Sequence, residues 1–279
     1  MTLAASATKA EQAAMLRLAR EAATLVLQVR DAGFEVEMKA ADDPVTRADK
    51  EANQLICGSL AAEFPSHGVL GEESVPAVPA ELAALLGKDR VFFVDPVDGT
   101  REFAEKRHDF CVMIGLAVDG RAVAGAIAVP MEKKLFWGDI ATGAFLEDEA
   151  GNRRELHVAP VDDPRKARAV VSRSHPSAQT AKVLEHLGIT SITPCGSVGV
   201  KAARVIEGAA DLYVHVSKGA KLWDACAPEA ILRGAGGSLT DLAGHPIDYR
   251  GILSIENGLV ASSPSLLPKI VDAIRAIRS

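Results

Sequence analysis

The chain opens with two stretches in which apolar residues recur at helical spacing. Residues 8–29 are rich in Ala and Leu with charges distributed along them, and residues 46–64 repeat this pattern after the turn-like segment AADDP. The first part of the chain is therefore predicted to form two helices.

A different pattern follows, in which short apolar runs are separated by Gly, Asp and Pro. Runs of this length and punctuation are typical of β-strands joined by tight turns, and consecutive ones favour a largely antiparallel sheet. The predicted strands are GVLG (68–71), VFFVD (91–95), FCVMIGLAV (110–118), AVAGAIAV (122–129) and KLFWGDI (134–140).

The second half alternates between strand and helix patterns, as layered α/β folds do. Strands are expected over residues 167–172, up to 193 and over 211–216, and helices over 176–187, 197–207, from 223 onward and over 264–277. The polar stretch 147–166 is the best candidate for a boundary. We therefore predict an N-terminal α+β half, residues 1–150, and a C-terminal α/β half, residues 151–279, packed into one body.

Composition narrows the range of functions. With 279 residues, 48% of them hydrophobic, the chain can bury a sizeable core. The net charge of −6 and the lack of a basic run argue against a general nucleic-acid binder. The four cysteines show no zinc or disulfide spacing, and no signal peptide or bilayer-length apolar run is evident. These features predict a cytoplasmic protein that does not act on membranes.

Two carboxylates, Asp95 and Asp98, lie three residues apart where the apolar run VFFV ends. They would repel each other unless cations lay between them, and hard oxygen ligands suit magnesium. Gly99 permits a tight turn, after which backbone amides can face a phosphate. The alternative is that DPVDG is a plain strand-ending turn, because Asp, Pro and Gly are common in turns.

Three further acids lie within or next to predicted strands or helices. Glu72, followed by Glu73, comes after a short apolar run, Asp224 opens a predicted helix, and Asp49 ends the segment DPVTRAD. Singly, Glu72 is explained as a solvated loop acid and Asp224 as a helix cap. Their occurrence together, in this order, favours a metal site.

The segments GEE, DPVDGT, WDACAPEA and DPVTRAD resemble the metal-site motifs of the inositol monophosphatase superfamily. The matches extend over most of the chain, from about residue 43 to 244. The resemblance implies a layered α-β-α-β-α sandwich of the inositol monophosphatase and fructose-1,6-bisphosphatase type. It also implies a phosphatase that uses two or three Mg²⁺ ions, is often inhibited by lithium and is frequently a homodimer.

The resemblance also implies a role for individual residues. Asp49 matches a catalytic acid that assists a further metal or the attacking water, and Thr100 matches the hydroxyl that hydrogen-bonds that water. The implied metal ligands are Glu72, Asp95, the carbonyl of Val97, Asp98 and Asp224, with Asp95 shared between two ions.

Two further segments bear on the substrate. Ser172-Arg173-Ser174-His175 resembles the SRSH or TRSH motif of the 3'(2'),5'-bisphosphate nucleotidases, and GSVGVK resembles their nucleotide-binding segment. The implied substrate contacts are Gly99, Thr100, Ser172, His175, Gly196, Ser197 and Lys201. The alternatives are a surface histidine before a proline and a capped helix with a solvated lysine.

The sequence thus predicts a magnesium-dependent phosphomonoesterase that converts adenosine 3',5'-bisphosphate to AMP and phosphate. An inositol-1-monophosphatase or related sugar phosphatase is the alternative within enzymes. A non-catalytic, magnesium-dependent nucleotide sensor is the alternative from another class, although it would not need Thr100 and Asp49 beside the metals.

Overall fold

A computed structural model describes residues 6–40, 43–216 and 219–278, so two residues of the AADDP segment lie outside the described part. Both opening helices are confirmed, as α1 (Lys9–Ala32) and α2 (Arg47–Glu63). Each begins with a capping box, in which a threonine and an acid three residues later satisfy each other's backbone amides: Thr8 with Glu11, and Thr46 with Asp49.

The predicted antiparallel sheet has seven strands in the order β3-β4-β5-β6-β7-β8-β9. β3 and β4 pair in parallel, and each later pair is antiparallel. The strands are β3 (Gly68–Gly71), β4 (Arg90–Asp98), β5 (Cys111–Val118), β6 (Arg121–Val129), β7 (Lys134–Asp139), β8 (Gly143–Glu147) and β9 (Arg153–Leu156). The sheet thus continues past the predicted boundary at residue 150, because the polar stretch there forms an exposed edge strand.

The second half forms a five-stranded sheet in the order β11-β10-β12-β14-β13. The predicted helices and strands are confirmed, and the short β13 and β14 complete the sheet. The elements are β10 (Arg168–Ser172), α5 (Ala178–His186), β11 (Ser191–Cys195), α6 (Val198–Ile206), β12 (Leu212–His215), α7 (Leu222–Gly234), β13 (Ser238–Thr240), β14 (Leu259–Ser262) and α8 (Leu267–Arg278).

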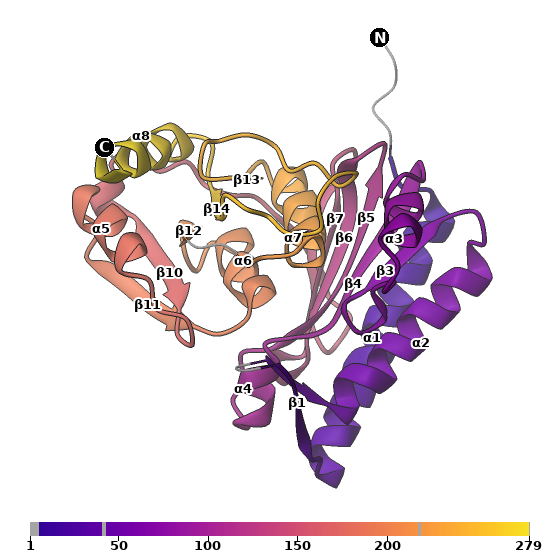
Figure 1. The fold of residues 1–279 in the computed structure, drawn as a ribbon. Helices are drawn as coiled ribbons and strands as arrows, with labels where there is room; N and C mark the ends of the chain where they lie inside the picture. The colour runs from indigo at the N-terminus through magenta and orange to yellow at the C-terminus, as the bar shows by residue number, and fades with distance from the viewer. Residues whose placement is uncertain (1–5, 41–42, 217–218, 279) are drawn as a thin grey trace.

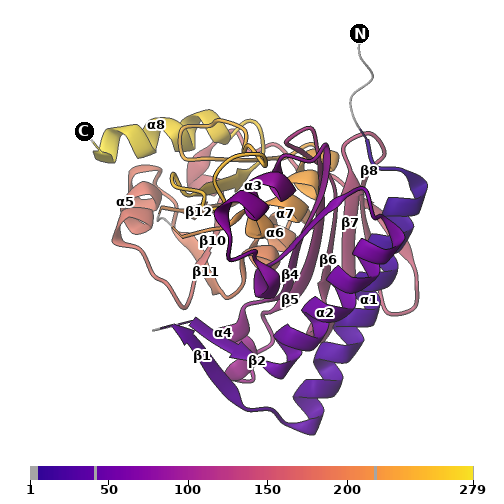
Figure 2. The same ribbon diagram turned by 45° about the vertical axis from the view of Figure 1, so that its right-hand side comes forward.

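The helices and sheets alternate in five layers (Figures 1 and 2). Helices α1 and α2 cover one face of the seven-stranded sheet, α6 and α7 lie between the two sheets, and α5 and α8 cover the far face of the second sheet. Three apolar clusters fill the spaces between these layers. The predicted α-β-α-β-α sandwich is confirmed.

Smaller elements surround the central layers. A hairpin of β1 (Val36–Ala40) and β2 (Asp43–Thr46) precedes α2, and the short helices α3 (Pro79–Leu86) and α4 (Thr100–Ala104) flank β4. The sequence did not predict these elements. No helix in the described ranges has both the length and the apolar character needed to cross a bilayer.

Helix α7 packs unusually close to the first sheet because of two glycines. Gly115 on β5 pairs with Gly125 on β6, and a Cβ at either position would lie 2.6 Å or 2.4 Å from backbone atoms of Ala227. Only glycine allows this approach. Because Ala227 lies one turn after Asp224, this contact fixes where α7 begins relative to β4.

A buried ionic cluster fastens the start of α1 to the first sheet. Glu11 is 2% exposed and accepts hydrogen bonds from Arg90 at 2.7 and 2.8 Å, from His67 at 2.7 Å and from the Thr8 amide at 2.6 Å. Burial alone raises the pKa of Glu11, but these hydrogen bonds outweigh it and lower the pKa from 4.5 to about 2.

We therefore expect Glu11→Gln to lower the free energy of unfolding at pH 7 by about 2 kcal/mol, the scale of a charge-assisted hydrogen bond. Because the folded-state pKa lies below the unfolded value, wild type should hold this advantage above pH 4.5 and lose it as the pH falls toward 2. Urea unfolding at several pH values measures the difference. Glu21→Gln, an exposed acid on the same helix, should show little effect at any pH; an equal effect would contradict the role of the cluster.

Candidate active site

Strand β4 carries two candidate ligands that a regular strand would point to opposite faces. Asp95 pairs with Met113 and Asp98 with Cys111, so three steps along β4 match two along β5. This bulge adds one residue, and both carboxylates consequently face the same side. Asp95 is 2% exposed and Asp98 is 8% exposed.

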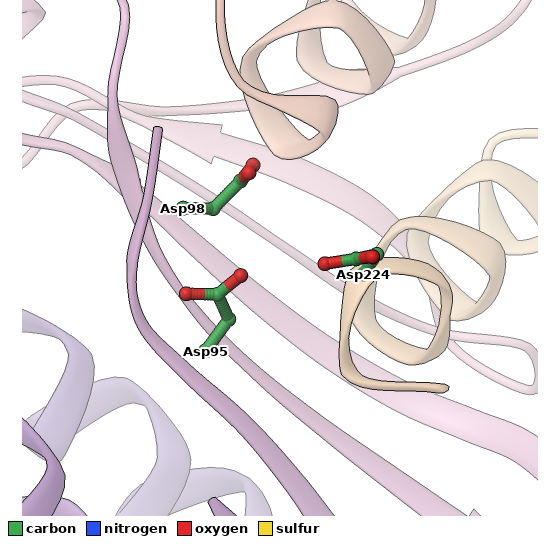
Figure 3. A group of neighbouring side chains, drawn as sticks. All are labelled: Asp95, Asp98 and Asp224. Atoms are coloured by element: carbon green, nitrogen blue, oxygen red, sulfur yellow. The ribbon is translucent and has the colours of Figure 1, made fainter. Parts of the chain in front are cut away.

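The start of α7 brings a third carboxylate to this point. One oxygen from each of Asp95, Asp98 and Asp224 lies within 4.8 Å of the others, and the three side chains point toward one another (Figure 3). The Lys221 amide donates to Asp224 Oδ2 at 2.6 Å, and the Ser197 hydroxyl and Gly199 amide donate to Asp98 Oδ2. The cluster is thus held from three separate segments.

The charges in this cluster call for a cation. Burial, reinforced by neighbouring carboxylates, raises the pKa of Asp95 and of Asp224 well above the ordinary range. Asp95 Oδ1 is buried without a hydrogen-bond partner. A buried, unpaired oxygen among carboxylates is costly unless a metal ion binds it, and hard oxygen donors are those that Mg²⁺ prefers. The donor set fits magnesium.

Glu72 lines the same cavity as the three aspartates. Its carboxylate pairs with a lysine that the sequence did not single out. Lys39 Nζ lies 3.0 Å from Glu72 Oε1 and 2.7 Å from Glu73 Oε1. Burial raises the pKa of Glu72 to about 7. The lysine ammonium therefore supplies positive charge next to the acidic cluster.

Asp49 and Thr100 form a direct hydrogen-bonded pair. Thr100 Oγ1 lies 2.8 Å from Asp49 Oδ1 and 3.0 Å from the carbonyl oxygen of Val97. Asp49 Oδ2 accepts hydrogen bonds from the backbone amide of Thr46 at 2.8 Å and from its hydroxyl at 2.6 Å. Asp49 is 1% exposed, and burial raises its pKa. The capping box at the start of α2 thus fixes an acid beside Thr100.

Two cavities meet at this cluster. A chamber of about 520 Å³ contains the acidic side, including Lys39, Glu72 and Asp95. A chamber of about 650 Å³ extends toward the second sheet. Both are lined by Asp98, Gly99, Thr100, Gly219 and Asp224. A ligand in the larger chamber therefore reaches the acidic cluster.

Six of the seven predicted substrate contacts line the larger chamber: Gly99, Thr100, Ser172, His175, Ser197 and Lys201. Lys201 is 3% exposed, burial lowers its pKa, and its ammonium lies 5.2 Å from the ring centre of Tyr213. Gly196 is placed differently, because its amide donates to Asp109. A Cβ at Gly196 would lie 2.3 Å from Glu102, so the glycine is required sterically.

The larger chamber also contains residues that the sequence did not single out. Tyr213 and His215 come from β12, and Glu102 and Ser174 form a hydrogen bond between α4 and the loop after β10. Burial, with the charges of Lys201 and His175, lowers the pKa of His215 to about 4. The DGTRE and SRSH segments contained Glu102 and Ser174, but nothing in the sequence paired them.

Comparison with known proteins agrees with this geometry. The model of the inositol monophosphatase family matches residues 8–279. The chain belongs to the inositol monophosphatase family. Members of this family are magnesium-dependent in general, consistent with the acidic cluster.

Two similar relatives within the family are both named as 3'(2'),5'-bisphosphate nucleotidases. The human protein named 3'(2'),5'-bisphosphate nucleotidase 1 is 32% identical over 280 residues, covering 89% of this chain and 86% of its own. The Escherichia coli K12 protein named 3'(2'),5'-bisphosphate nucleotidase CysQ is 33% identical over 235 residues, covering 84% of this chain and 91% of its own.

Solved structures share the fold. Bartonella henselae SuhB superposes with a TM-score of 0.80 at 24% identity, covering 96% of this chain and 99% of its own. CysQ from Bacteroides thetaiotaomicron, described as a bacterial member of the inositol monophosphatase family, superposes with a TM-score of 0.75 at 26% identity, covering 91% of this chain and 97% of its own.

We expect Asp95→Asn to lower turnover at least about a hundredfold, because it removes charge that stabilises the transition state. The same change removes repulsion in the metal-free protein, so its melting temperature in chelator should equal or exceed that of wild type. Added Mg²⁺ should then raise the melting temperature of wild type but not of the variant.

Glu229→Gln is the matched control for this experiment. Glu229 is also buried, and burial raises its pKa to about 7, but it bonds Tyr249 outside both chambers. Magnesium should still stabilise this variant. Near-normal activity of a folded Asp95→Asn protein would contradict the metal-site assignment.

Proposed function

We propose that this protein is a magnesium-dependent 3'(2'),5'-bisphosphate nucleotidase that converts adenosine 3',5'-bisphosphate to AMP and phosphate. The observation that carries this proposal is the meeting of the two chambers along Asp98, Thr100 and Asp224. One chamber offers carboxylates for metal ions, and the other offers room and polar groups for the rest of a nucleotide.

In this proposal the acids of the smaller chamber would hold two or three Mg²⁺ ions. The proposed ligands are Glu72, Asp95, the carbonyl of Val97, Asp98 and Asp224. When bound, the ions neutralise charge on the phosphoryl oxygens and lower the pKa of the attacking water.

Asp49 and Thr100 provide a path for the proton of the attacking water. Thr100 Oγ1 donates a hydrogen bond to Asp49 Oδ1, so its lone pairs remain to accept a hydrogen bond from the attacking water. The raised pKa of buried Asp49 makes it a better proton acceptor than an exposed aspartate. As the water attacks, its proton passes to Thr100 Oγ1 while the Thr100 proton passes to Asp49.

The larger chamber accommodates the part of the substrate that does not react. The buried ammonium of Lys201 lines this chamber and is available to neutralise the second phosphate. Ser197, Ser172 and His175 line the same chamber, where an imidazole can stack on a base and a hydroxyl can hydrogen-bond. Gly99 allows the chain to turn between the metal ligands and Thr100.

An inositol or sugar phosphatase is the alternative, because the metal-binding acids would serve either substrate. The names of the similar relatives and the buried Lys201 favour the nucleotide. The paired Asp49 and Thr100 favour catalysis over a role as a nucleotide sensor. We also propose a cytoplasmic location, supported by four cysteines that are free of disulfides, and action on a small molecule rather than a nucleic acid.

The proposal predicts that kcat/KM for adenosine 3',5'-bisphosphate far exceeds that for inositol 1-phosphate. His175→Ala should lower kcat/KM for the nucleotide roughly tenfold, the scale of one stacking contact, and change inositol 1-phosphate hydrolysis little. Release of inorganic phosphate, measured with Mg²⁺ present, tests both statements.

His186→Ala is the control, because His186 is exposed at the other end of α5 and should leave both reactions unchanged. Two outcomes would refute the nucleotidase assignment: a wild-type preference for inositol 1-phosphate, or an equal loss of both activities in His175→Ala. Either would leave the broader phosphatase assignment in place.

A further inference from the structure

The four residues of the SRSH segment divide into two pairs. Ser172, Ser174 and His175 line the larger chamber, and the His175 amide donates to Ser172 Oγ at 3.1 Å. The side chains of Arg173 and Ser174 bind acids that follow Asp98 in the sequence, whereas those of Ser172 and His175 do not. The proposed nucleotide contacts explain the first pair and leave the second without a function.

Arg173 joins three segments of the chain. Its guanidinium forms an ion pair with the carboxylate of Asp109, just before β5, and donates to the carbonyl of Pro194 at 3.1 Å. Its backbone amide donates to the carbonyl of Cys195 at 3.0 Å. The loop after β10 is therefore fixed both to the end of β11 and to the first half of the chain.

Asp109 contacts both the turn at Gly99, which follows the metal-binding aspartates of β4, and the segment at Gly196 that precedes α6. Its carboxylate accepts the Gly196 amide at 2.5 Å as well as the Arg173 guanidinium. These hydrogen bonds lower its pKa in spite of burial, which by itself acts in the opposite direction. A Cβ at Gly99 would lie 3.1 Å from the Asp109 carbonyl oxygen and 3.2 Å from Ser197 Cβ, so the three segments are in contact.

Ser174 and Glu102 form a second connection of the same kind. The Ser174 hydroxyl donates to Glu102 Oε1, and Glu102 is 3% exposed and belongs to α4, two residues after Thr100. Its side chain fills the space that a Cβ at Gly196 would need. Both connections run from the segment after the metal ligands to the loop that carries Ser172 and His175.

We propose that Arg173 and Asp109 are positioning residues that hold the nucleotide-contacting loop at a fixed place relative to the metal-binding carboxylates. This proposal rests on the proposed function and deepens it. A nucleotide must reach the metal site with its reacting phosphate and the loop with its nucleoside, so the separation of these two sites selects the esters that bind productively. An ester without a nucleoside does not use the loop and does not depend on the pair.

Arg173→Ala, Asp109→Asn and the double variant test this role. Each single change should raise the KM for adenosine 3',5'-bisphosphate and the inhibition constant of AMP roughly tenfold, the scale of one charge-assisted hydrogen bond. The inhibition constant of inorganic phosphate, which needs only the metal site, should change less than about twofold. In the double variant, the KM for the nucleotide and the inhibition constant of AMP should rise no further than in the weaker-binding single variant, because both changes break the same interaction.

Arg168→Ala is the matched control. Arg168 lies at the opposite end of the same strand and pairs with Asp211 in a similar, partly exposed ion pair. The Arg168→Ala variant should be less stable than wild type but keep the same KM for the nucleotide and the same inhibition constants of AMP and inorganic phosphate. Arg173→Lys retains the charge but not the forked geometry, and it should fall between wild type and Arg173→Ala even if the alanine variant folds poorly.

The outcomes separate this inference from the proposed function. A wild-type protein that does not hydrolyse the nucleotide contradicts the nucleotidase proposal. A wild-type protein that does, combined with Asp109→Asn and Arg173→Lys variants that match Arg168→Ala or that weaken AMP and phosphate equally, overturns the positioning role alone.

Discussion

Repulsion among buried carboxylates is the constraint on which the rest of this structure depends. Asp95, Asp98 and Asp224 approach within 4.8 Å, and Asp95 retains a buried oxygen without a partner. Such an arrangement is costly in a folded chain without metal. The fold tolerates this cost through features that resist local collapse: the bulge in β4, the close packing of α7 on Gly115 and Gly125, and the amides that hold two of the carboxylates.

The layered architecture turns this cluster into a site with two sides. Helices α6 and α7 lie between the two sheets. Asp224 at the start of α7 lines both chambers, and Ser197, just before α6, lines the larger one and donates a hydrogen bond to Asp98. The first sheet supplies the metal side and the second supplies the strand ends that face the substrate. The contacts through Asp109 and Glu102 connect the two sides where they meet.

The sequence predicted what local pattern determines. Helices α1 and α2, the central strands and the alternating second half followed from the periodicity of apolar residues. The family resemblance assigned Asp49 and Thr100 to one catalytic site, and the structure places them in hydrogen-bond contact. It did not predict Lys39 beside Glu72, because a lysine on an exposed hairpin resembles any solvated charge. It also missed the Arg173 and Asp109 pair, because 64 residues separate them and only tertiary packing brings them together.

Diffraction from crystals soaked with Mn²⁺ and AMP tests the central claim most directly, because anomalous scattering locates the metal independently of any activity. The account predicts metal peaks between Asp95, Asp98 and Asp224, with the AMP phosphate in the larger chamber near Lys201. Metal peaks elsewhere, or AMP bound away from the border of the two chambers, would contradict it.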